Sequence, residues 1–436
     1  MSEPTIRSTQ SLRKAITLRH AVALYVSSVL GSGVLVLPGL AAKIAGPASL
    51  VAWILLSLGS YPFAYTFASL SSRKPESGGV YAFAKESFGV RVATITGWLF
   101  ALWFVTGGPA VIVIAASYLG YAFPLGRLSV YLIASVVLVV PFVVNYRGIT
   151  FSNKVQVAVT ISIIALLVAA IVASVGFVKP ENFSPFLPHG LIPIGTAAAL
   201  VFWSYLGYEN VSNVAEEFRD PKRDFHRSIT LSVILIGFLY TAVAFVTIGT
   251  LAYEAGGSVA PFAVIFSNVL GSYGKAGTAL LALFIIFGTA NAYTTGMSRV
   301  IYVTAKDGGL PKQIYHLNER GVPDRSLILL FSSSMLVLAA YYSLNVNLEI
   351  ALMIPSGGAI LVYIIGSLAG IKLLKERGIK GTLPWIALIM SVLVLPFVGI
   401  WLLGAIVVAI SALVYCIVVG RFESSVVAKA SSKQEI

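Results

Sequence analysis

The residues best suited to hold a ligand form a short run of small residues inside the first long apolar stretch of the chain. Gly31, Ser32 and Gly33 interrupt that stretch. Two glycines and a serine at bilayer depth weaken a helix, and lipid offers the freed backbone groups no partner. Such a break persists only where it lines a cavity inside the protein and bonds something there. The run therefore predicts a binding site built largely from main-chain groups.

A second interruption, from Ser204 to Gly207, lies in the sixth apolar segment. Paired interruptions at matching places in two halves point to the binding site of a secondary transporter. The first break would offer N–H groups and a positive helix end, which suit a carboxylate. The second, at Phe202, Trp203 and Ser204, would offer carbonyls, which suit an ammonium. An α-amino acid carries both groups on one carbon, and neither break has an Arg or Lys near it.

Close helix packing is the alternative explanation for the first break. Small residues let two membrane helices approach each other without any ligand between them. Packing glycines need not cluster, however, and here three small residues stand together at 31–33. The clustering favours a break over a packing stripe.

The composition is that of a polytopic membrane protein. Hydrophobic residues make up 58% of the 436 residues and charged residues 11%, with a mean hydropathy of +0.90. A soluble chain of this length would carry far more charge. Twelve apolar segments approach or exceed the roughly 20 residues that a bilayer core requires: 18–43, 47–72, 92–123, 128–145, 154–177, 189–214, 228–252, 274–304, 325–343, 347–371, 382–397 and 399–420.

The basic residues predict the orientation of these spans. With the N-terminus inside, only four of the 30 Lys and Arg fall outside, which leaves 26 inside; the four are Lys43, Arg127, Lys179 and Lys275. The positive-inside rule then predicts cytoplasmic segments at 1–17 and 421–436. We expect a multi-pass protein of the plasma membrane. The net charge of +13 follows from this topology, so nucleic acid is not expected as a partner.

No pattern typical of catalysis or metal binding occurs. Cys416 is the one cysteine, which excludes a disulfide within the chain. The sequence has no HExxH, paired carboxylates or Ser/His/Asp arrangement, and its histidines lie at span ends or in loops: His20, His189, His226 and His316. We expect neither an enzyme nor a cofactor or metal site.

Spans one to five (18–177) and six to ten (189–371) can be laid over each other as two five-helix units. Because five is odd, the second unit would enter the membrane inverted, with the breaks in helices 1 and 6. Spans eleven and twelve, at 382–420, would be peripheral. The Gly- and Pro-containing segment 255–273 is expected to be a structured outer loop.

Several motifs in one order resemble the amino acid-polyamine-organocation (APC) superfamily, and within it the amino acid permeases and exchangers. They are GSGV in the first span, PESGGVY after the second, the sixth span with its exit, and the end of the eighth, at 31–34, 75–81, 202–221 and 298–311. The first span and the stretch 216–225 are similar to exporters of methionine and branched-chain amino acids. The resemblance implies an all-α, five-plus-five inverted-repeat (LeuT-like) fold and alternating access around a central site.

The chain departs from the family pattern at two places. His226 stands where family members usually carry proline, before the seventh span. Some proton-coupled members carry a lysine in the fifth span, and the matching stretch here, 159–164, has none. Exchange, another proton carrier or sodium therefore all stay open, with Ser162, Thr294 and Thr295 as hydroxyls that could face a sodium ion.

Glu209 is the one carboxylate placed deep in a span. A buried acid costs at least about 2.5 kcal/mol and is a functional candidate by default, as proton carrier or gate. A permanently protonated structural acid is the alternative. Asn291, at mid-span, could bond either another helix or a ligand.

Aromatic residues near the breaks could form walls and gates, although in spans they more often pack or anchor; they are Trp103, Phe202, Trp203, Tyr205 and Tyr293. Ser356 and Gly357 follow Pro355 in the tenth span and could form a gate hinge or simply pack. The loosened third span, at 107–109, has no acid or base nearby, which favours a neutral, mainly apolar substrate side chain.

These patterns together predict a secondary transporter of neutral α-amino acids, working as an antiporter or by ion coupling. A polyamine or cationic amino acid exchanger is the alternative within transport, although only Glu209 could supply its acidic pocket. A nutrient sensor on the same fold is the alternative outside transport. The sequence carries no signal for the oligomeric state.

Overall fold

The structure is a computed structural model that describes residues 12–123, 125–254 and 261–431. Regular structure in this part of the chain is helical, and the only β contacts are two isolated bridges. The helices are α1 Leu18–Leu30, α2 Gly33–Ala45, α3 Ser49–Arg73, α4 Val80–Phe88, α5 Val90–Ala122, α6 Arg127–Tyr146, α7 Ile149–Val175, α8 Ile192–Phe202, α9 Pro221–Gly249, α10 Pro261–Leu270, α11 Gly274–Lys306, α12 Asp324–Ser343, α13 Leu348–Met353, α14 Ser356–Leu374, α15 Ile379–Val398 and α16 Trp401–Ser431.

Ten stretches of the described chain are long and apolar enough to cross a membrane. One of them, Gly33–Arg73, joins α2 and α3, whereas α1 and α8 are shorter apolar helices. Backbone groups in a bilayer must be bonded within the protein, and helices satisfy that demand locally. The predicted all-α membrane protein is confirmed; the count of twelve spans and the inverted repeat remain predictions.

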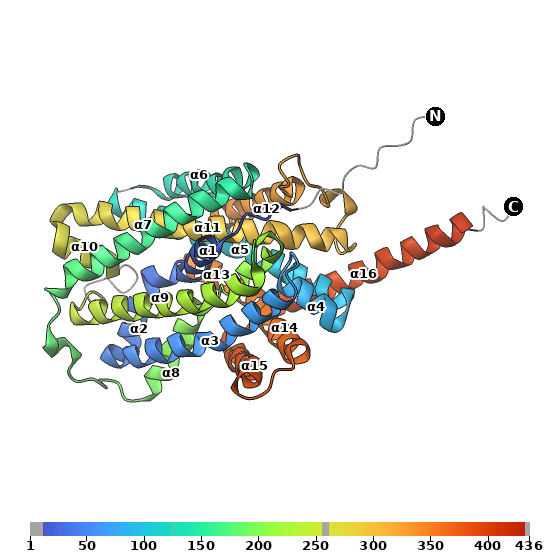
Figure 1. The fold of residues 1–436 in the computed structure, drawn as a ribbon. Helices are drawn as coiled ribbons and strands as arrows, with labels where there is room; N and C mark the ends of the chain where they lie inside the picture. Colours follow the sequence, from blue (N-terminus) through green and yellow to red (C-terminus); the bar gives the residue numbers. More distant parts are fainter. Residues whose placement is uncertain (1–11, 124, 255–260, 432–436) are drawn as a thin grey trace.

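The central helices pack on one another in a consistent pattern. α3 lies along α9, α5 lies along α11, and α1 contacts α7, α9 and α11. The bundle therefore encloses α1, while α15 lies at its edge and α16 extends beyond it (Figure 1). The apolar side chains that α16 leaves exposed, such as Leu403, Val407 and Ile410, suit contact with lipid.

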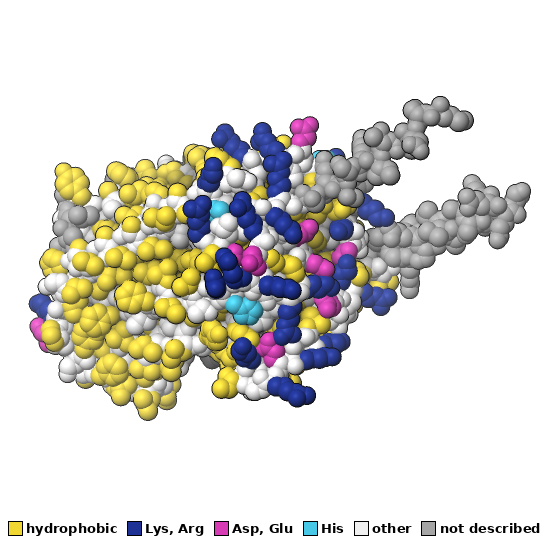
Figure 2. Space-filling model, viewed as in Figure 1, with side chains coloured by type: hydrophobic (Ala, Val, Ile, Leu, Met, Phe, Trp, Pro, Cys, Tyr) yellow, Lys and Arg dark blue, Asp and Glu magenta, His cyan; other side chains and the backbone are white. Residues whose placement is uncertain are grey.

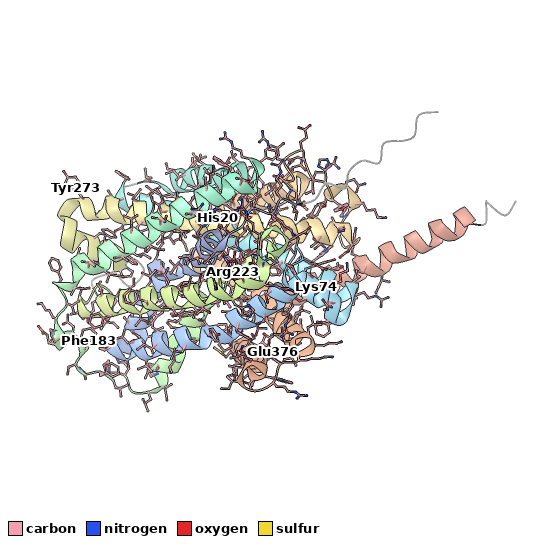
Figure 3. All side chains as sticks on the ribbon, in the orientation of Figure 1. His20, Lys74, Phe183, Arg223, Tyr273 and Glu376 are labelled. Carbon is pink, nitrogen blue, oxygen red and sulfur yellow. The ribbon has the colours of Figure 1, made fainter. Side chains whose placement is uncertain are left out.

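Charged side chains gather at one end of the molecule, around α4, and the flanks are hydrophobic (Figure 2). Lys74 and Glu376 lie at this basic end, whereas Phe183 and Tyr273 lie at the other (Figure 3). The segregation is what a bilayer between the two ends would require.

The segment predicted as a structured outer loop is partly described. Residues 255–260 lie outside the described part of the chain. The remainder forms α10 and a short 3₁₀ turn, Gly271–Tyr273, which packs with α10 against α11.

Candidate substrate-binding site

The first break separates two helices within one apolar stretch. α1 ends at Leu30 and α2 begins at Gly33. Gly31 has φ 41° and ψ −154°, a backbone conformation that would be strained in any residue with a Cβ. The first N–H groups of α2 have no partner within that helix, so they can receive an acceptor from outside.

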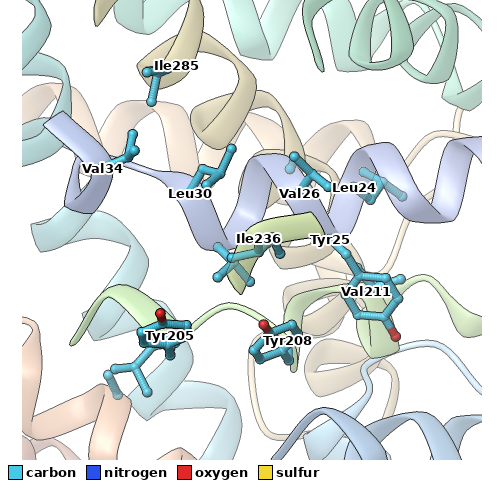
Figure 4. Packing of buried hydrophobic residues seen from close by; sticks show 14 of the residues in the cluster. Leu24, Tyr25, Val26, Leu30, Val34, Tyr205, Tyr208, Val211, Ile236 and Ile285 are labelled. Carbon is cyan, nitrogen blue, oxygen red and sulfur yellow. The ribbon is translucent and has the colours of Figure 1, made fainter. Parts of the chain in front are cut away.

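The second break follows α8. A 3₁₀ turn, Trp203–Tyr205, ends the helix, and the next helical turn begins only at Asn210. Gly207 between them has φ 131°, and a Cβ on it would lie 2.7 Å from the carbonyl O of Ser28. Glycine is required there, because any side chain would collide with the end of α1. Figure 4 shows the backbone leaving the helical path in both segments, between Leu30 and Val34 and between Tyr205 and Tyr208.

The two breaks touch each other. A Cβ on Gly33 would lie 2.7 Å from Oγ of Ser204. The Tyr240 hydroxyl, from α9, lies 2.8, 2.9 and 3.1 Å from the carbonyl oxygens of Val29, Leu30 and Ser204. A phenol has one hydrogen to donate, so these carbonyls share it. Tyr240 therefore ties the carbonyl ends of both breaks together.

A cavity of about 120 Å³ opens where the breaks meet. One face of α5 and one face of α11 form most of its walls, with lining residues spaced one helical turn apart. From α5 they are Phe104, Gly107, Gly108, Val111 and Ile112; from α11 they are Thr289, Ala290, Tyr293, Thr294 and Met297. Ser28, Ser32 and Ser204 line it from the breaks. None of the described lining residues is charged, so polar recognition there depends on hydroxyls and main-chain groups.

Several predicted site residues line this cavity: Gly31, Ser32, Gly33, Trp103, Ser204 and Tyr293. The other predicted residues whose side chains the structure describes lie elsewhere. Phe202 packs edge-on against Phe63 at 5.8 Å, and the Tyr205 hydroxyl lies 2.7 Å from Ser57 Oγ, on the side of α3. The side chain of Trp203 lies outside the described part of the structure.

Glu209 is fully buried. It does not line the cavity but bonds Tyr293, which does. Its carboxylate accepts from the N–H of Gly207 at 2.9 Å and from the Tyr293 hydroxyl at 3.2 Å. The Tyr363 hydroxyl, from α14, donates to the same carboxylate. The acid therefore links the second break to α11 and α14, and reaches the cavity through Tyr293.

These observations suit a small zwitterion, and the comparisons with known proteins decide the family. A family model described as Amino acid permease matches residues 16–429. The chain belongs to this family of the APC superfamily. The resemblance predicted from the motifs is thereby confirmed, and the permease is a multi-pass membrane protein.

Three of the relatives illustrate the similarity. The permease is 34% identical over 378 residues to the uncharacterized amino acid permease YecA of Bacillus subtilis (strain 168), covering 86% of this chain and 88% of the relative. It is 30% identical over 373 residues to the L-methionine/branched-chain amino acid exporter YjeH of Escherichia coli (strain K12), covering 84% and 88%. It is 27% identical over 394 residues to the branched-chain amino acid permease BcaP of Bacillus subtilis, covering 84% and 82%.

Asn291 in the permease belongs to a buried polar cluster between α6, α7 and α11. Its Nδ2 donates to Gln156 Oε1 at 2.7 Å, and its Oδ1 accepts from Asn145 Nδ2 at 3.0 Å. Ser152 and Thr295 complete the cluster. Of the two roles open to Asn291, this arrangement favours the bond between helices, as is common for amides in membrane bundles.

The hydroxyls considered for sodium are dispersed. Ser162 is partly exposed and donates to the carbonyl of Ala158. Thr295 joins the cluster around Asn291, and Thr294 lines the cavity. In the described ranges no group of three or more His, Cys, Asp or Glu is arranged to hold a metal ion.

The candidate hinge at the start of α14 is tightly packed. The Ser356 hydroxyl donates to the carbonyl of Met353, and a Cβ on Gly357 would lie 2.7 Å from the carbonyl O of Trp401. Pro355, one residue earlier, lines the cavity. The contact of Gly357 with α16 fits the packing alternative.

A buried ion pair lies between the cavity and the basic end of the permease. Two residues beyond Met297, Arg299 pairs with Glu217 through bonds of 2.7 and 3.2 Å, and both side chains are buried. Burial raises the pKa of Glu217 above its ordinary value, and the Arg299 guanidinium opposes that rise. The segment before α1 adds a cover, because Ile16 forms a β-bridge with Phe218.

The sequence did not reveal several residues that line the cavity. Ser28 lies one helical turn before Ser32, and Thr289 one turn before Tyr293, so helical spacing could have indicated both. Leu138 of α6 and Ser334 of α12 gave no such signal, because nothing in the sequence showed that the fourth and ninth spans reach the cavity.

Proposed function

We propose that this protein is a secondary transporter that moves neutral, mainly apolar α-amino acids across the plasma membrane by alternating access. The observation that carries the proposal is the contact of two interrupted helices, with Gly33 against Ser204, beside an uncharged cavity. The N–H groups at the start of α2 suit the carboxylate of the substrate. Carbonyls at the second break suit its ammonium.

The substrate class follows from the remaining walls. Phe104, Val111, Ile112 and Leu352 are apolar. A cationic side chain there would lose its hydration without gaining a counter-ion, which is costly. A neutral side chain would gain from burial of its apolar area. The names of the relatives YjeH and BcaP, which refer to methionine and branched-chain amino acids, agree with this class.

Alternating access requires that one side close while the other opens. The Arg299–Glu217 pair and the contact between Ile16 and Phe218 close the basic end. The positive-inside rule makes that end cytoplasmic. The geometry therefore suits a state closed to the cytoplasm, with Tyr293 and Glu209 placed to couple the cavity to the second break.

We further propose the architecture predicted from the sequence. The paired α1/α2 and α8 breaks would each begin a five-helix unit, at 18–177 and 189–371, inverted relative to each other. α15 and α16, within 382–420, would be peripheral, as the exposed face of α16 suggests. The basic end would carry both termini, and α1 with α2, and α8 with its following turns, would complete twelve spans.

Two other functions remain to be tested against this one. A cationic amino acid or polyamine exchanger would need an acidic cavity, and Glu209 reaches the cavity only through Tyr293. The names of several plant relatives, such as cationic amino acid transporter 3 of Arabidopsis thaliana, agree with this alternative. A sensor would bind the same amino acids without flux.

Transport in proteoliposomes separates these functions. Uptake of labelled leucine, methionine and arginine is measured with and without internal amino acid, and with a pH or sodium gradient. We expect leucine or methionine uptake, with stimulation by internal substrate indicating exchange and stimulation by a gradient indicating coupling. Arginine uptake alone would favour the cationic alternative, and binding without any flux would favour the sensor.

A further inference from the structure

The cavity extends beyond the helices that carry the two breaks. Leu138 and Pro141 of α6 and Ser334 of α12 line it together with Phe104 of α5. α12 packs against both α5 and α6, so these residues form one continuous wall. We call this part of the cavity, between α5, α6 and α12, the side arm.

The side arm has apolar and aromatic walls. Phe104 contacts Phe142 with ring centroids 6.3 Å apart, and Phe142 contacts Phe331 at 5.2 Å, both edge to face. Of these three rings Phe104 lines the cavity, and the other two pack behind it between α5, α6 and α12. Such a wall favours an apolar group, which gains from leaving water.

One polar atom interrupts these walls. Ser334 has no exposed surface, and its hydroxyl has no hydrogen-bond partner among the described residues. Serines in helices usually bond the carbonyl four residues earlier, as Ser343 of the same helix does with Ala339 at 2.9 Å. A buried hydroxyl without a partner is costly. Ser326 of the same helix is in the same state, but Ser334 differs from it in lining the cavity. A ligand that enters the side arm would find a donor there.

We propose that the side arm is the subsite for the substrate side chain, and that Ser334 recognises a hydrogen-bond acceptor at its far end. The inference rests on the proposed transport of amino acids and adds a selectivity to it. The uncharged walls require a neutral side chain, and their apolar surface requires that most of it be hydrocarbon. A thioether satisfies both conditions, because its sulfur is a weak acceptor within an apolar chain. Methionine is then preferred over its isostere norleucine, which has a methylene in place of sulfur.

A substitution at Gly108 tests the side arm independently of Ser334. It lines the cavity, and a Cβ on it would meet nothing within 4 Å. A side chain at this position therefore extends into empty space instead of displacing its neighbours. Gly108→Val should reduce the space available to a long substrate side chain while α5 stays intact.

The test measures binding of L-methionine, L-norleucine and L-alanine to the purified full-length protein by calorimetry. In the wild type we expect methionine to bind at least about threefold more tightly than norleucine. Ser334→Ala should bring that ratio close to one and leave norleucine affinity nearly unchanged. Ser326→Ala is the matched control, because Ser326 is also a fully buried serine of α12 and has no hydrogen-bond partner in the described ranges, but it does not line the cavity.

Each outcome has a distinct meaning. If Ser334→Ala keeps the preference for methionine, or Ser326→Ala loses it equally, the hydroxyl holds only water or acts at a distance, and the inference is wrong. Gly108→Val should weaken methionine about tenfold or more while alanine is retained; equal loss of both would remove the side arm as the subsite. If the wild type binds no amino acid at all, the proposed function fails, which is a separate result.

Discussion

Gly33 and Ser204 face each other so closely that a Cβ on the glycine would lie 2.7 Å from the serine Oγ. The two residues belong to the two breaks and are 171 positions apart (204 − 33). Their contact means that the main-chain groups of both breaks can reach one small ligand at once. Glycine at 33 is therefore a requirement of this close contact, since any Cβ there would collide with Ser204.

Gly33→Ala tests this contact. The added methyl group must displace Ser204 or the Tyr240 hydroxyl, which would lie 3.2 Å from it. Overpacking of this kind costs about 1–3 kcal/mol, and here it falls on the site itself. We expect substrate affinity to drop about tenfold or more by calorimetry, with normal membrane insertion. Gly195→Ala in α8, where a Cβ meets nothing within 4 Å, is the control.

Gly31→Leu tests the break itself. Gly31 has a positive φ and lines the cavity, so a leucine there is strained and occupies ligand space. We expect substrate binding to be abolished while the protein still reaches the membrane, as measured by calorimetry and membrane fractionation. Retained affinity would mean that the break serves helix packing alone.

Tyr240→Phe removes the hydroxyl shared by three carbonyls while its ring keeps stacking on Trp53 at 5.1 Å. The loss of one buried donor costs about 1–3 kcal/mol. Because the carbonyls belong to both breaks, we expect weaker substrate binding as well as a lower melting temperature in detergent. Tyr118→Phe, which removes a buried hydroxyl that donates to Leu35 at 3.2 Å, should lower the melting temperature without a comparable change in affinity.

The breaks and the family were predictable from sequence because their signals are local. Gly31, Ser32 and Gly33 interrupt an apolar run, and only a few structures tolerate that in lipid. Tyr240 and Ser334 carry no such signal. A tyrosine or serine in an apolar span reads the same whether it faces lipid, a neighbouring helix or a cavity, and that choice depends on the packing of distant helices. For Asn291 the sequence likewise left two roles open, a bond to another helix or a bond to a ligand. Its hydrogen-bond partners became known only from the structure.

Glu209→Gln tests whether the buried acid exchanges protons during transport. Glutamine can still accept a bond from Tyr293 or Tyr363, but it cannot ionise. If Glu209 carries protons, leucine uptake by the variant should lose its dependence on external pH. The same pH profile in variant and wild type, measured in proteoliposomes over pH 5 to 8, would leave Glu209 as a structural acid.

The Arg299–Glu217 pair should contribute strongly to the state closed at the basic end. Removal of one partner from a buried ion pair costs about 3–5 kcal/mol, because the other charge stays buried without its counter-ion. We expect Glu217→Gln to lower the melting temperature. We also expect it to increase the labelling of cysteines introduced between the basic end and the cavity. The control is Asp307→Asn, which breaks the Lys85–Asp307 pair of 2.7 Å at the surface, where such pairs contribute about 0–1 kcal/mol. Similar effects of both variants would argue against Arg299–Glu217 as the closing contact.

The two ends of α12 provide a test of orientation. Glu319 precedes this helix on the side of the basic end, and Ser343 ends it on the other side; both are exposed. In a Cys416→Ser background, which removes the one native cysteine, each position is changed to cysteine in turn. A membrane-impermeant maleimide added to intact cells should label Ser343→Cys, and it should label Glu319→Cys only after the membrane is permeabilised. The reverse result would place the basic end outside, against the positive-inside rule, and labelling of both from one side would mean that α12 does not span the membrane.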